Sequence, residues 1–189
     1  MTPWGYEVEA MPPLVTVEQF NALTGGQYAD DPRLVSALGA VSGLIRMACR
    51  WHVAPNIECT YTAAGGEKII ALPALAVTSV ESVTEKGVEL APGQYEYRRE
   101  GMLRRCGFKR WAPGWNAVTA VYKAGYDEIP AEVMEIAFTR VLAEISLPVG
   151  IRSETAGGVS ISYATAGYEG GLSSIETMAL LPYALPVEV

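Results

Sequence analysis

Residues 118–163 read VTAVYKAGYDEIPAEVMEIAFTRVLAEISLPVGIRSETAGGVSISY, and the succession of patterns in this stretch decides the fold. A strand pattern and a Gly-Tyr turn are followed by an amphipathic helix that begins at Pro130 and runs to about Ser146. Residues 150–171 then contain six glycines among many Ser, Thr and Ala residues. This composition predicts an extended arm that is weakly held in an isolated subunit, because it offers little apolar burial. Such an arm is typical of a subunit that reaches a neighbour.

Two longer helices are expected to share a core. Asp31-Pro32 predicts the start of the first one, with aspartate as the cap and proline in the first turn. Gly39 and Gly43 on this helix permit a close helix approach, either inside one subunit or between subunits. Its apolar stripe consists of Leu34, Leu38, Val41, Ile45 and Ala48. The buried face expected for the helix from Pro130 consists of Met134, Phe138, Val141, Leu142 and Ile145, with Val133 and Ala137 beside it.

Two capping boxes predict two short helices. Thr16–Gln19 begins a helix of about two turns that Gly25-Gly26 ends. Ser173–Glu176 begins a terminal helix through Leu181, which we interpret as a docking element outside the cores. Residues 1–15, with three prolines and scattered acids, are expected to be a flexible or draped segment.

In the segment between the two longer helices, the spacing of apolar residues changes from one every 3.6 residues to one every two residues. Turn sequences rich in Gly and Pro separate short alternating segments, which is typical of a small antiparallel sandwich or barrel. The expected strands are Ile57–Tyr61, Lys68–Leu72, Val77–Glu85, Gln94–Arg98, Met102–Arg105 and Ala117–Lys123.

The predicted fold class is therefore α+β: a small helical bundle with an inserted antiparallel β-sandwich or barrel-like unit and an extended C-terminal arm. The expected division has an N-terminal segment and helices in residues 1–55 and the inserted β-unit in 56–126. A helix that completes the helical core occupies 127–149, and the arm with the short terminal helix occupies 150–189.

Composition limits the class of protein. Half of the 189 residues are apolar and about a fifth are charged, which is typical of a globular chain. The longest apolar runs, Ile69–Val77 and Met178–Val187, are short and broken by proline, so no membrane partner is expected. The acidic N-terminus does not resemble a signal peptide, and we expect the protein to stay in the cytoplasm where it is made.

Few residues are candidates for chemistry. The only histidine, His52, is expected to be structural, and no phosphate loop or catalytic arrangement is apparent. Cys49, His52 and Cys59 could be imagined as a zinc site but lack a fourth ligand, and buried reduced thiols are the favoured interpretation for the three cysteines. We therefore expect no catalytic residue, no metal and no cofactor.

Charge is distributed unevenly along a chain whose net charge is −7. Nine acids and three bases lie from Trp111 onward, whereas thirteen upstream positions hold six bases opposed only by Glu100. This segregation favours contacts between unlike faces of neighbouring subunits, although Phe108, Trp111 and Trp115 could also stack on nucleic acid beside these bases. The basic cluster consists of Arg98, Arg99, Arg104, Arg105, Lys109 and Arg110.

The ordered set of motifs resembles the head–tail connector (adaptor) proteins of long-tailed bacteriophages, in the version with a β-unit between helices. The resemblance covers most of residues 31–183. In the β-unit it is carried by Leu72-Pro73, Val77–Val83, Gly87, Tyr95, Trp111 and Val121–Tyr126. Further along it is carried by Ile129-Pro130 and, in the arm, by Ser153, Glu154, Gly158, Ser160, Ile161, Ser162 and Tyr163.

The resemblance implies a structural virion protein that forms a ring of twelve subunits in the neck, assembled in the cytoplasm of the host bacterium. Its implied partners are other copies of itself, the portal protein, and a stopper or tail protein below. Genome DNA would pass through the lumen without being read. The arm residues would dock on the portal or on a neighbour.

A rival interpretation is a β-sandwich binding module of a phage particle. It would hold a glycan or a tail protein on an aromatic platform made by Tyr95, Tyr97, Trp111 and Trp115.

Overall fold

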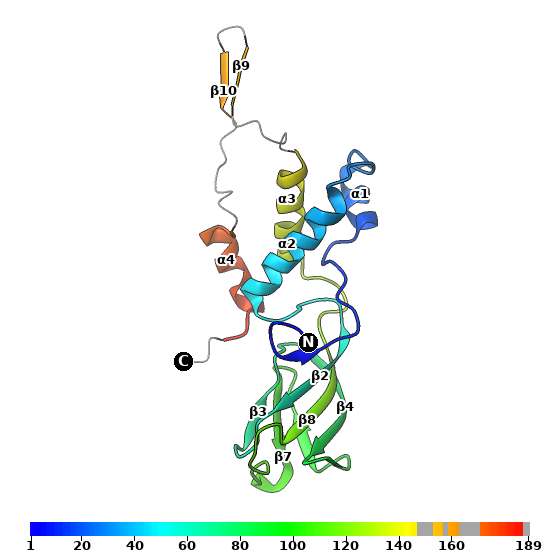
Figure 1. The fold of residues 1–189 in the computed structure, drawn as a ribbon, viewed down its shortest axis with the longest axis vertical. Helices are drawn as coiled ribbons and strands as arrows, with labels where there is room; N and C mark the ends of the chain where they lie inside the picture. The colour runs from blue at the N-terminus through cyan, green and yellow to red at the C-terminus, as the bar shows by residue number, and fades with distance from the viewer. Residues whose placement is uncertain (147–152, 157–158, 163–170, 187–189) are drawn as a thin grey trace. The chain divides into compact units, whose positions relative to one another are not determined.

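The computed structural model describes residues 1–146, 153–156, 159–162 and 171–186. The chain divides into two compact units. The strand unit contains Met1–Pro12, Cys49–Pro130 and the C-terminal end from Pro182, and the helical unit contains Pro13–Ala48 and Ala131–Leu181. Figure 1 shows the order of the elements along the chain.

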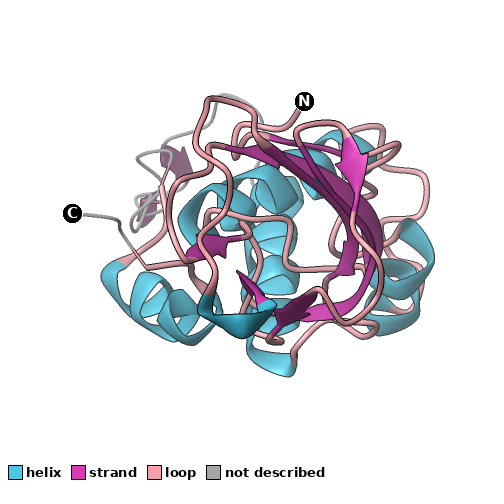
Figure 2. Ribbon diagram, turned by 90° about the horizontal axis from the view of Figure 1, so that it is seen from below, coloured by secondary structure: helices cyan, strands magenta, loops and turns pink. Residues whose placement is uncertain are grey.

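The strand unit holds two antiparallel sheets. The larger sheet has the order β1-β2-β8-β4-β5, and its strands curve strongly (Figure 2). The smaller sheet has the order β3-β7-β6. The larger sheet consists of β1 (Tyr6–Glu7), β2 (Ile57–Ala63), β8 (Val118–Ala124), β4 (Val77–Glu85) and β5 (Val88–Glu89). The smaller one consists of β3 (Ile69–Ala71), β7 (Met102–Arg105) and β6 (Tyr95–Tyr97), and the 3-10 turn η1 (Cys106–Phe108) follows β7.

All six strands expected from the alternating pattern are present, and the α+β fold class is confirmed. Two strands, β1 and β5, were not predicted, because a two-residue strand carries no readable alternation. The segment expected to be draped therefore includes β1, in which Tyr6 lies opposite Tyr61 and is fully buried.

Strand β8 organises the larger sheet, since β2 pairs with it on one side and β4 on the other. Its side chains alternate, and Val118, Ala120, Tyr122 and Ala124 all point into the core. This period of two is the pattern that the sequence displayed.

The turn after β8 requires glycine. Gly125 has φ +120°, and a Cβ built on it would lie 2.2 Å from the carbonyl oxygen of Pro55. The Gly125 N–H donates to the oxygen of Ala76 (3.0 Å), and the next N–H, that of Tyr126, donates to the oxygen of Val53 (2.9 Å). No other residue type permits this backbone approach.

The helical unit contains α1 (Val17–Thr24), α2 (Leu34–Cys49), α3 (Ala131–Ser146) and α4 (Ser174–Leu180), which the 3-10 turn η2 (Leu181–Tyr183) follows. Both capping boxes are confirmed. The Thr16 hydroxyl accepts the Gln19 N–H, the Gln19 side chain accepts the Thr16 N–H, and Ser173 and Glu176 repeat the arrangement. Gly25 ends α1 in the left-handed conformation.

Helix α2 begins at Leu34, two residues later than Pro32. The Asp31 carboxylate accepts the Arg33 N–H (2.8 Å), and its carbonyl accepts the Leu34 N–H (3.1 Å), so these residues form a turn that leads into the helix. The predicted apolar stripe is buried except for Ala48, which is half-buried.

The buried face of α3 differs from the predicted one. Met134, Phe138 and Leu142 are half-buried. The face is rotated because α4 packs on α3 and covers Arg140, a residue that the polar pattern did not place inside. Phe138 instead packs on Phe20 of α1, with ring centroids 5.2 Å apart. The buried residues are Val133, Ile136, Ala137, Arg140, Val141 and Ile145.

In the predicted arm, β9 (Ser153–Ala156) and β10 (Val159–Ser162) form an antiparallel pair in which Ser153 lies opposite Ser162. The sequence predicted an extended arm here and did not predict that two segments of it would pair. Of the proposed arm residues, Gly158 and Tyr163 lie outside the described residues.

Candidate interaction surfaces

The only histidine of the chain belongs to a buried network in the strand unit. His52 is fully buried, and its Nε2 donates to the carbonyl oxygen of Ala124 (2.8 Å). The Tyr6 hydroxyl donates to His52 Nδ1 (2.8 Å) and accepts the backbone N–H of His52 (3.0 Å). Both ring nitrogens are thus occupied in joining β1 to the end of β8, a structural role.

Cys49 and Cys59 are buried thiols as expected, whereas Cys106 is half-buried, so the expectation of a buried thiol is wrong at Cys106 because it follows β7 at the surface of the smaller sheet. Burial raises the pKa of Cys49 and of Cys59 to about 12, so both remain protonated thiols near neutral pH. In the part of the chain that the structure describes, no three His, Cys, Asp or Glu side chains come together as metal ligands. Cys49, His52 and Cys59 therefore do not make the imagined zinc site.

No helix among the described residues combines the length and the apolar character needed to cross a bilayer.

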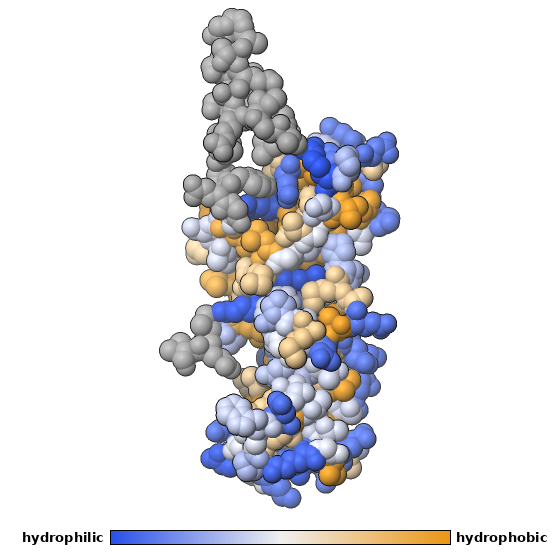
Figure 3. Space-filling model, viewed as in Figure 1, coloured by the Kyte–Doolittle hydropathy of each residue, from blue (hydrophilic) through white to orange (hydrophobic). Residues whose placement is uncertain are grey.

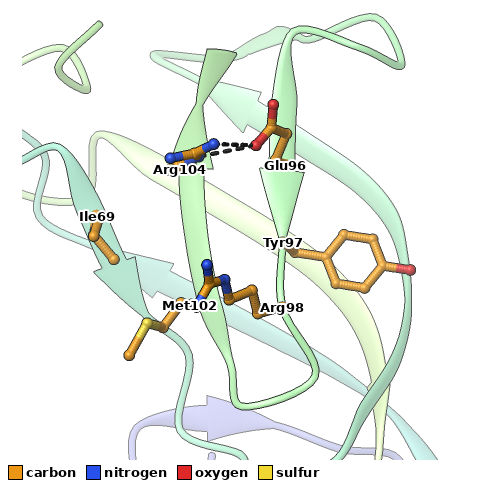
Figure 4. Close-up of a pocket in the computed structure, with 6 residues that line it drawn as sticks. All are labelled: Ile69, Glu96, Tyr97, Arg98, Met102 and Arg104. Atoms are coloured by element: carbon orange, nitrogen blue, oxygen red, sulfur yellow. Dashed lines mark hydrogen bonds and ion pairs between the residues drawn. The ribbon is translucent and has the colours of Figure 1, made fainter. Parts of the chain in front are cut away.

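The basic cluster lies on and after the β6–β7 hairpin, and half of it is paired within the strand unit. Arg104 forms an ion pair with Glu96 on the neighbouring strand (2.6 Å), and both side chains are about half exposed (Figure 4). Arg110 donates to the carbonyl oxygen of Gly66 (2.9 Å) and lies 3.5 Å from Glu67.

Arg105 is the most enclosed member of the basic cluster. Its guanidinium lies 3.7 Å from the Glu85 carboxylate and 5.9 Å from the centre of the Trp111 ring. Glu85 also accepts the Ala112 N–H (2.7 Å), so this pair anchors the loop that leads into β8. Arg105 therefore has a structural role inside its own subunit.

The remaining members, Arg98, Arg99 and Lys109, are exposed and form no ion pair with the described residues. The structure thus separates the cluster into three internally paired bases and three that face solvent. Sequence reasoning missed the partners Glu67, Glu85 and Glu96, since only the folded strand unit brings them close to the bases.

A shallow pocket of about 330 Å³ lies on the outer face of the smaller sheet (Figure 4). Ile69 and Met102 supply its apolar side, and Arg98 and the Glu96–Arg104 pair supply its polar side. Tyr97 points away from these residues in Figure 4.

The aromatic platform is not assembled. Trp111 is buried in the core, whereas Tyr95 is half-buried, and Tyr97 and Trp115 are exposed. With Trp111 inside, neither the stacked platform nor the stacking of this residue on nucleic acid is possible.

The terminal helix packs on α3, so the expectation that it lies outside the cores is wrong. Arg140 of α3 forms a nearly buried, bidentate ion pair with Glu176 of α4, and Leu180 is fully buried. In the strand unit, the Trp51 Nε1–H donates to the oxygen of Tyr183 (2.6 Å), and the Leu185 N–H donates to the oxygen of Cys49 (2.9 Å).

Three helices of the helical unit nevertheless leave apolar side chains exposed, and on α1 this is Leu23 alone, at 60%. On α4 and the following turn these are Ile175, Met178 and Leu181, which are 81%, 69% and 62% exposed. On α2 they are Val35 and Met47, at 70% and 59%. Figure 3 shows hydrophobic surface over the region where Figure 1 places α4.

No family model matches the chain, and no curated protein sequence matches it. Solved structures do match: the chain shares its fold with neck proteins.

One of these is a chain from the neck of a native GTA (gene transfer agent) particle computed with C12 symmetry. It is 15% identical and has a TM-score of 0.60, and the match covers 97% of this chain and 96% of that one. A second comes from the neck of an empty GTA particle computed with C6 symmetry. It is 15% identical with a TM-score of 0.62 and 97% coverage of both chains. The similarity includes both units and extends over almost the whole of each chain.

Proposed function

We propose that this protein is a structural subunit of the neck of a phage-like particle, and that it forms a head–tail connector (adaptor) ring between the portal and the stopper or tail. The observation that carries the proposal is the fold match over 97% of the chain with neck proteins. The order of motifs along the sequence supports it independently, because those motifs resemble adaptor proteins.

A ring of twelve copies is the proposed assembly. The GTA necks were computed with C12 and C6 symmetry, and both symmetries are compatible with twelve chains around one axis. A closed ring uses one heterologous interface repeatedly, so each subunit needs two different complementary faces.

The charge of the chain suits a channel for DNA. Genome DNA would pass through the lumen of the ring without being read, and a lumen must not hold a polyanion that has to leave quickly. Twelve copies of a subunit with a net charge of −7 repel DNA on average, whereas a basic lining would bind it through counterion release.

The portal is the proposed upper partner and the segment around β9 and β10 the proposed docking element. Backbone groups at the edges of a two-stranded pair can add a strand from another chain. The exposed bases Arg98, Arg99 and Lys109 are proposed to face protein, and the acids from Glu128 to Glu144 supply a surface of opposite charge on a neighbouring copy or a partner.

Electron microscopy of the purified protein, alone and mixed with portal rings from the same particle, tests the proposal. Rings seated coaxially on the portal are expected. A protein that remains monomeric in both samples and instead binds a glycan or a tail protein would overturn the proposal in favour of a binding module.

A further inference from the structure

The outer face of α2 lacks charge. Val35, Ser36, Gly39, Ala40, Gly43 and Met47 are all exposed, and none of them is ionisable. A helix whose outer face remains in solvent normally carries charged side chains on that face. Cβ atoms built on Gly39 and Gly43 would meet nothing within 4 Å, so these glycines do not serve packing among the described residues. Between Val35 and Met47 only small side chains stand on this face, and we name this strip of small residues the α2 groove.

Helix α4 carries large apolar side chains on its exposed side, where α2 carries mostly small ones. Ile175, Met178 and Leu181 recur every three residues, on the side of the helix away from buried Leu180. Three large apolar side chains in this spacing form a ridge, and large ridges pack into grooves formed by small residues. The other exposed residues of α4, Ser174, Thr177 and Ala179, are also uncharged.

We infer that the α4 ridge of one copy packs on the outer face of α2 in the next copy, and that this contact closes the ring; the inference rests on the proposed connector function. The ridge and the groove are different surfaces of the same chain, as a heterologous interface requires. Each copy then covers these two apolar faces of its helical unit with a single repeated contact.

Dimensions and charge favour a second copy as the occupant. From Val35 to Met47 the groove spans about 18 Å, and the seven-residue α4 is about 10 Å long, so the ridge fits within it. Copies of an acidic protein repel one another, and their contact is most favourable where neither face carries an acid. Charged residues are also depleted at the centres of protein interfaces.

Cysteine cross-linking tests the contact directly. In a Cys106→Ser background, Ala40→Cys and Met178→Cys are made as separate variants, and the two are mixed, assembled and oxidised. Disulfide-linked dimers are expected from the mixture, whereas neither variant alone should cross-link. Val88→Cys, an equally exposed apolar position on β5, replaces Ala40→Cys in the control mixture and should give none.

The alternative outcomes are distinguishable. A third protein carries Ala40→Cys and Met178→Cys in the same chain. Rings that form without the mixed disulfide, cross-links between identical single variants, or a disulfide within one chain of this double variant would overturn the contact and leave the connector function standing. Failure to form rings with or without the portal would overturn the connector function itself.

Filling the groove provides a second test that does not depend on chemistry at cysteine. Gly43→Leu has open space in the monomer and replaces glycine by a better helix former, so the melting temperature of the monomer should not fall. The same substitution should reduce ring formation at least tenfold, as should Met178→Glu, while Val88→Glu should have no effect. Normal assembly of the Gly43→Leu variant would contradict the inference.

Discussion

Glu176 has several hydrogen-bond donors around it, and each of them favours the ionised carboxylate. The guanidinium of Arg140, and then the hydroxyl and N–H of Ser173, lower the pKa of Glu176 to about 2 from an ordinary value of 4.5. The same carboxylate thus joins α3 to α4 and caps α4. One residue therefore couples a local capping motif to tertiary packing.

Replacing Glu176 by Gln should destabilise the protein by about 3 kcal/mol at pH 7, because Arg140 would remain nearly buried without a charged partner. A carboxylate with a lowered pKa stabilises the fold fully above its unfolded pKa of 4.5, and this contribution is lost as the pH falls through its folded pKa of about 2. Urea unfolding of the wild type and the Glu176→Gln variant at pH 7, 4.5 and 2.5 should show that the difference between their free energies of unfolding decreases in that order. Glu96→Gln, which removes the exposed partner of Arg104, is the matched control and should change stability little at any of these pH values.

Gly125→Ala should destabilise the protein by about 3 kcal/mol or more. The alanine would have to adopt an unfavourable φ, and its Cβ would clash with the carbonyl oxygen of Pro55. Gly87→Ala is the control, since its φ of +78° is also unfavourable but nothing lies within 4 Å of the added Cβ. It should cost about 1 kcal/mol. Equal losses for the two variants in chemical denaturation would show that the close approach to Pro55 does not matter.

At the scale of elements, the C-terminal segment has two distinct parts. In its end from Ser173, Glu176 and Leu180 pack within the helical unit, and Tyr183 and Leu185 form hydrogen bonds within the strand unit. The segment before it contains β9 and β10, which pair with each other. Stability and proposed docking are therefore assigned to different stretches of the segment.

Truncation after Ser146 should yield a protein that is not folded cooperatively. The deletion removes the partner of Arg140 and the buried Leu180, and each loss costs about 2–5 kcal/mol, which is comparable with the stability of a small domain. Loss of the near-UV circular dichroism signal and of a sharp thermal transition is expected.

A matched variant separates folding from docking. Replacing residues 150–171 by a Gly/Ser sequence of equal length keeps α4 and should leave the thermal transition within a few degrees of the wild-type value. If this variant still co-sediments with portal rings at unchanged affinity, the arm is not the docking element.

At the scale of the whole molecule, only the bases without internal partners are free to attract another subunit. Arg98→Glu with Arg99→Glu should therefore weaken assembly without lowering the stability of the monomer, and the effect should diminish as salt is raised from 50 to 500 mM because the attraction is screened. Arg105→Glu should instead lower the melting temperature, since it places a second acid beside Glu85. Sedimentation velocity at both salt concentrations checks the first expectation. A structure of the assembled ring with Arg98 and Arg99 lining the channel would refute it.

Local signals in the sequence determined the elements of this protein. The capping boxes at Thr16 and Ser173, the apolar stripe of α2 and the alternation of six strands all act between residues close in the chain. Their effects depend on backbone geometry that neighbouring residues share, so they could be read without knowledge of the fold.

The tertiary structure alone decided which residues became partners across the chain. The pairing of Arg140 with Glu176, of Arg105 with Glu85 and of His52 with Tyr6 joins positions 36, 20 and 46 residues apart, and no local pattern encodes such a choice. The rotated face of α3 has the same origin, because the position of α4 decides which side of α3 is covered. Whether a side chain is buried depends on what packs against it. The sequence therefore determined where helices and strands form, and the tertiary packing determined which of their faces are buried and which are exposed.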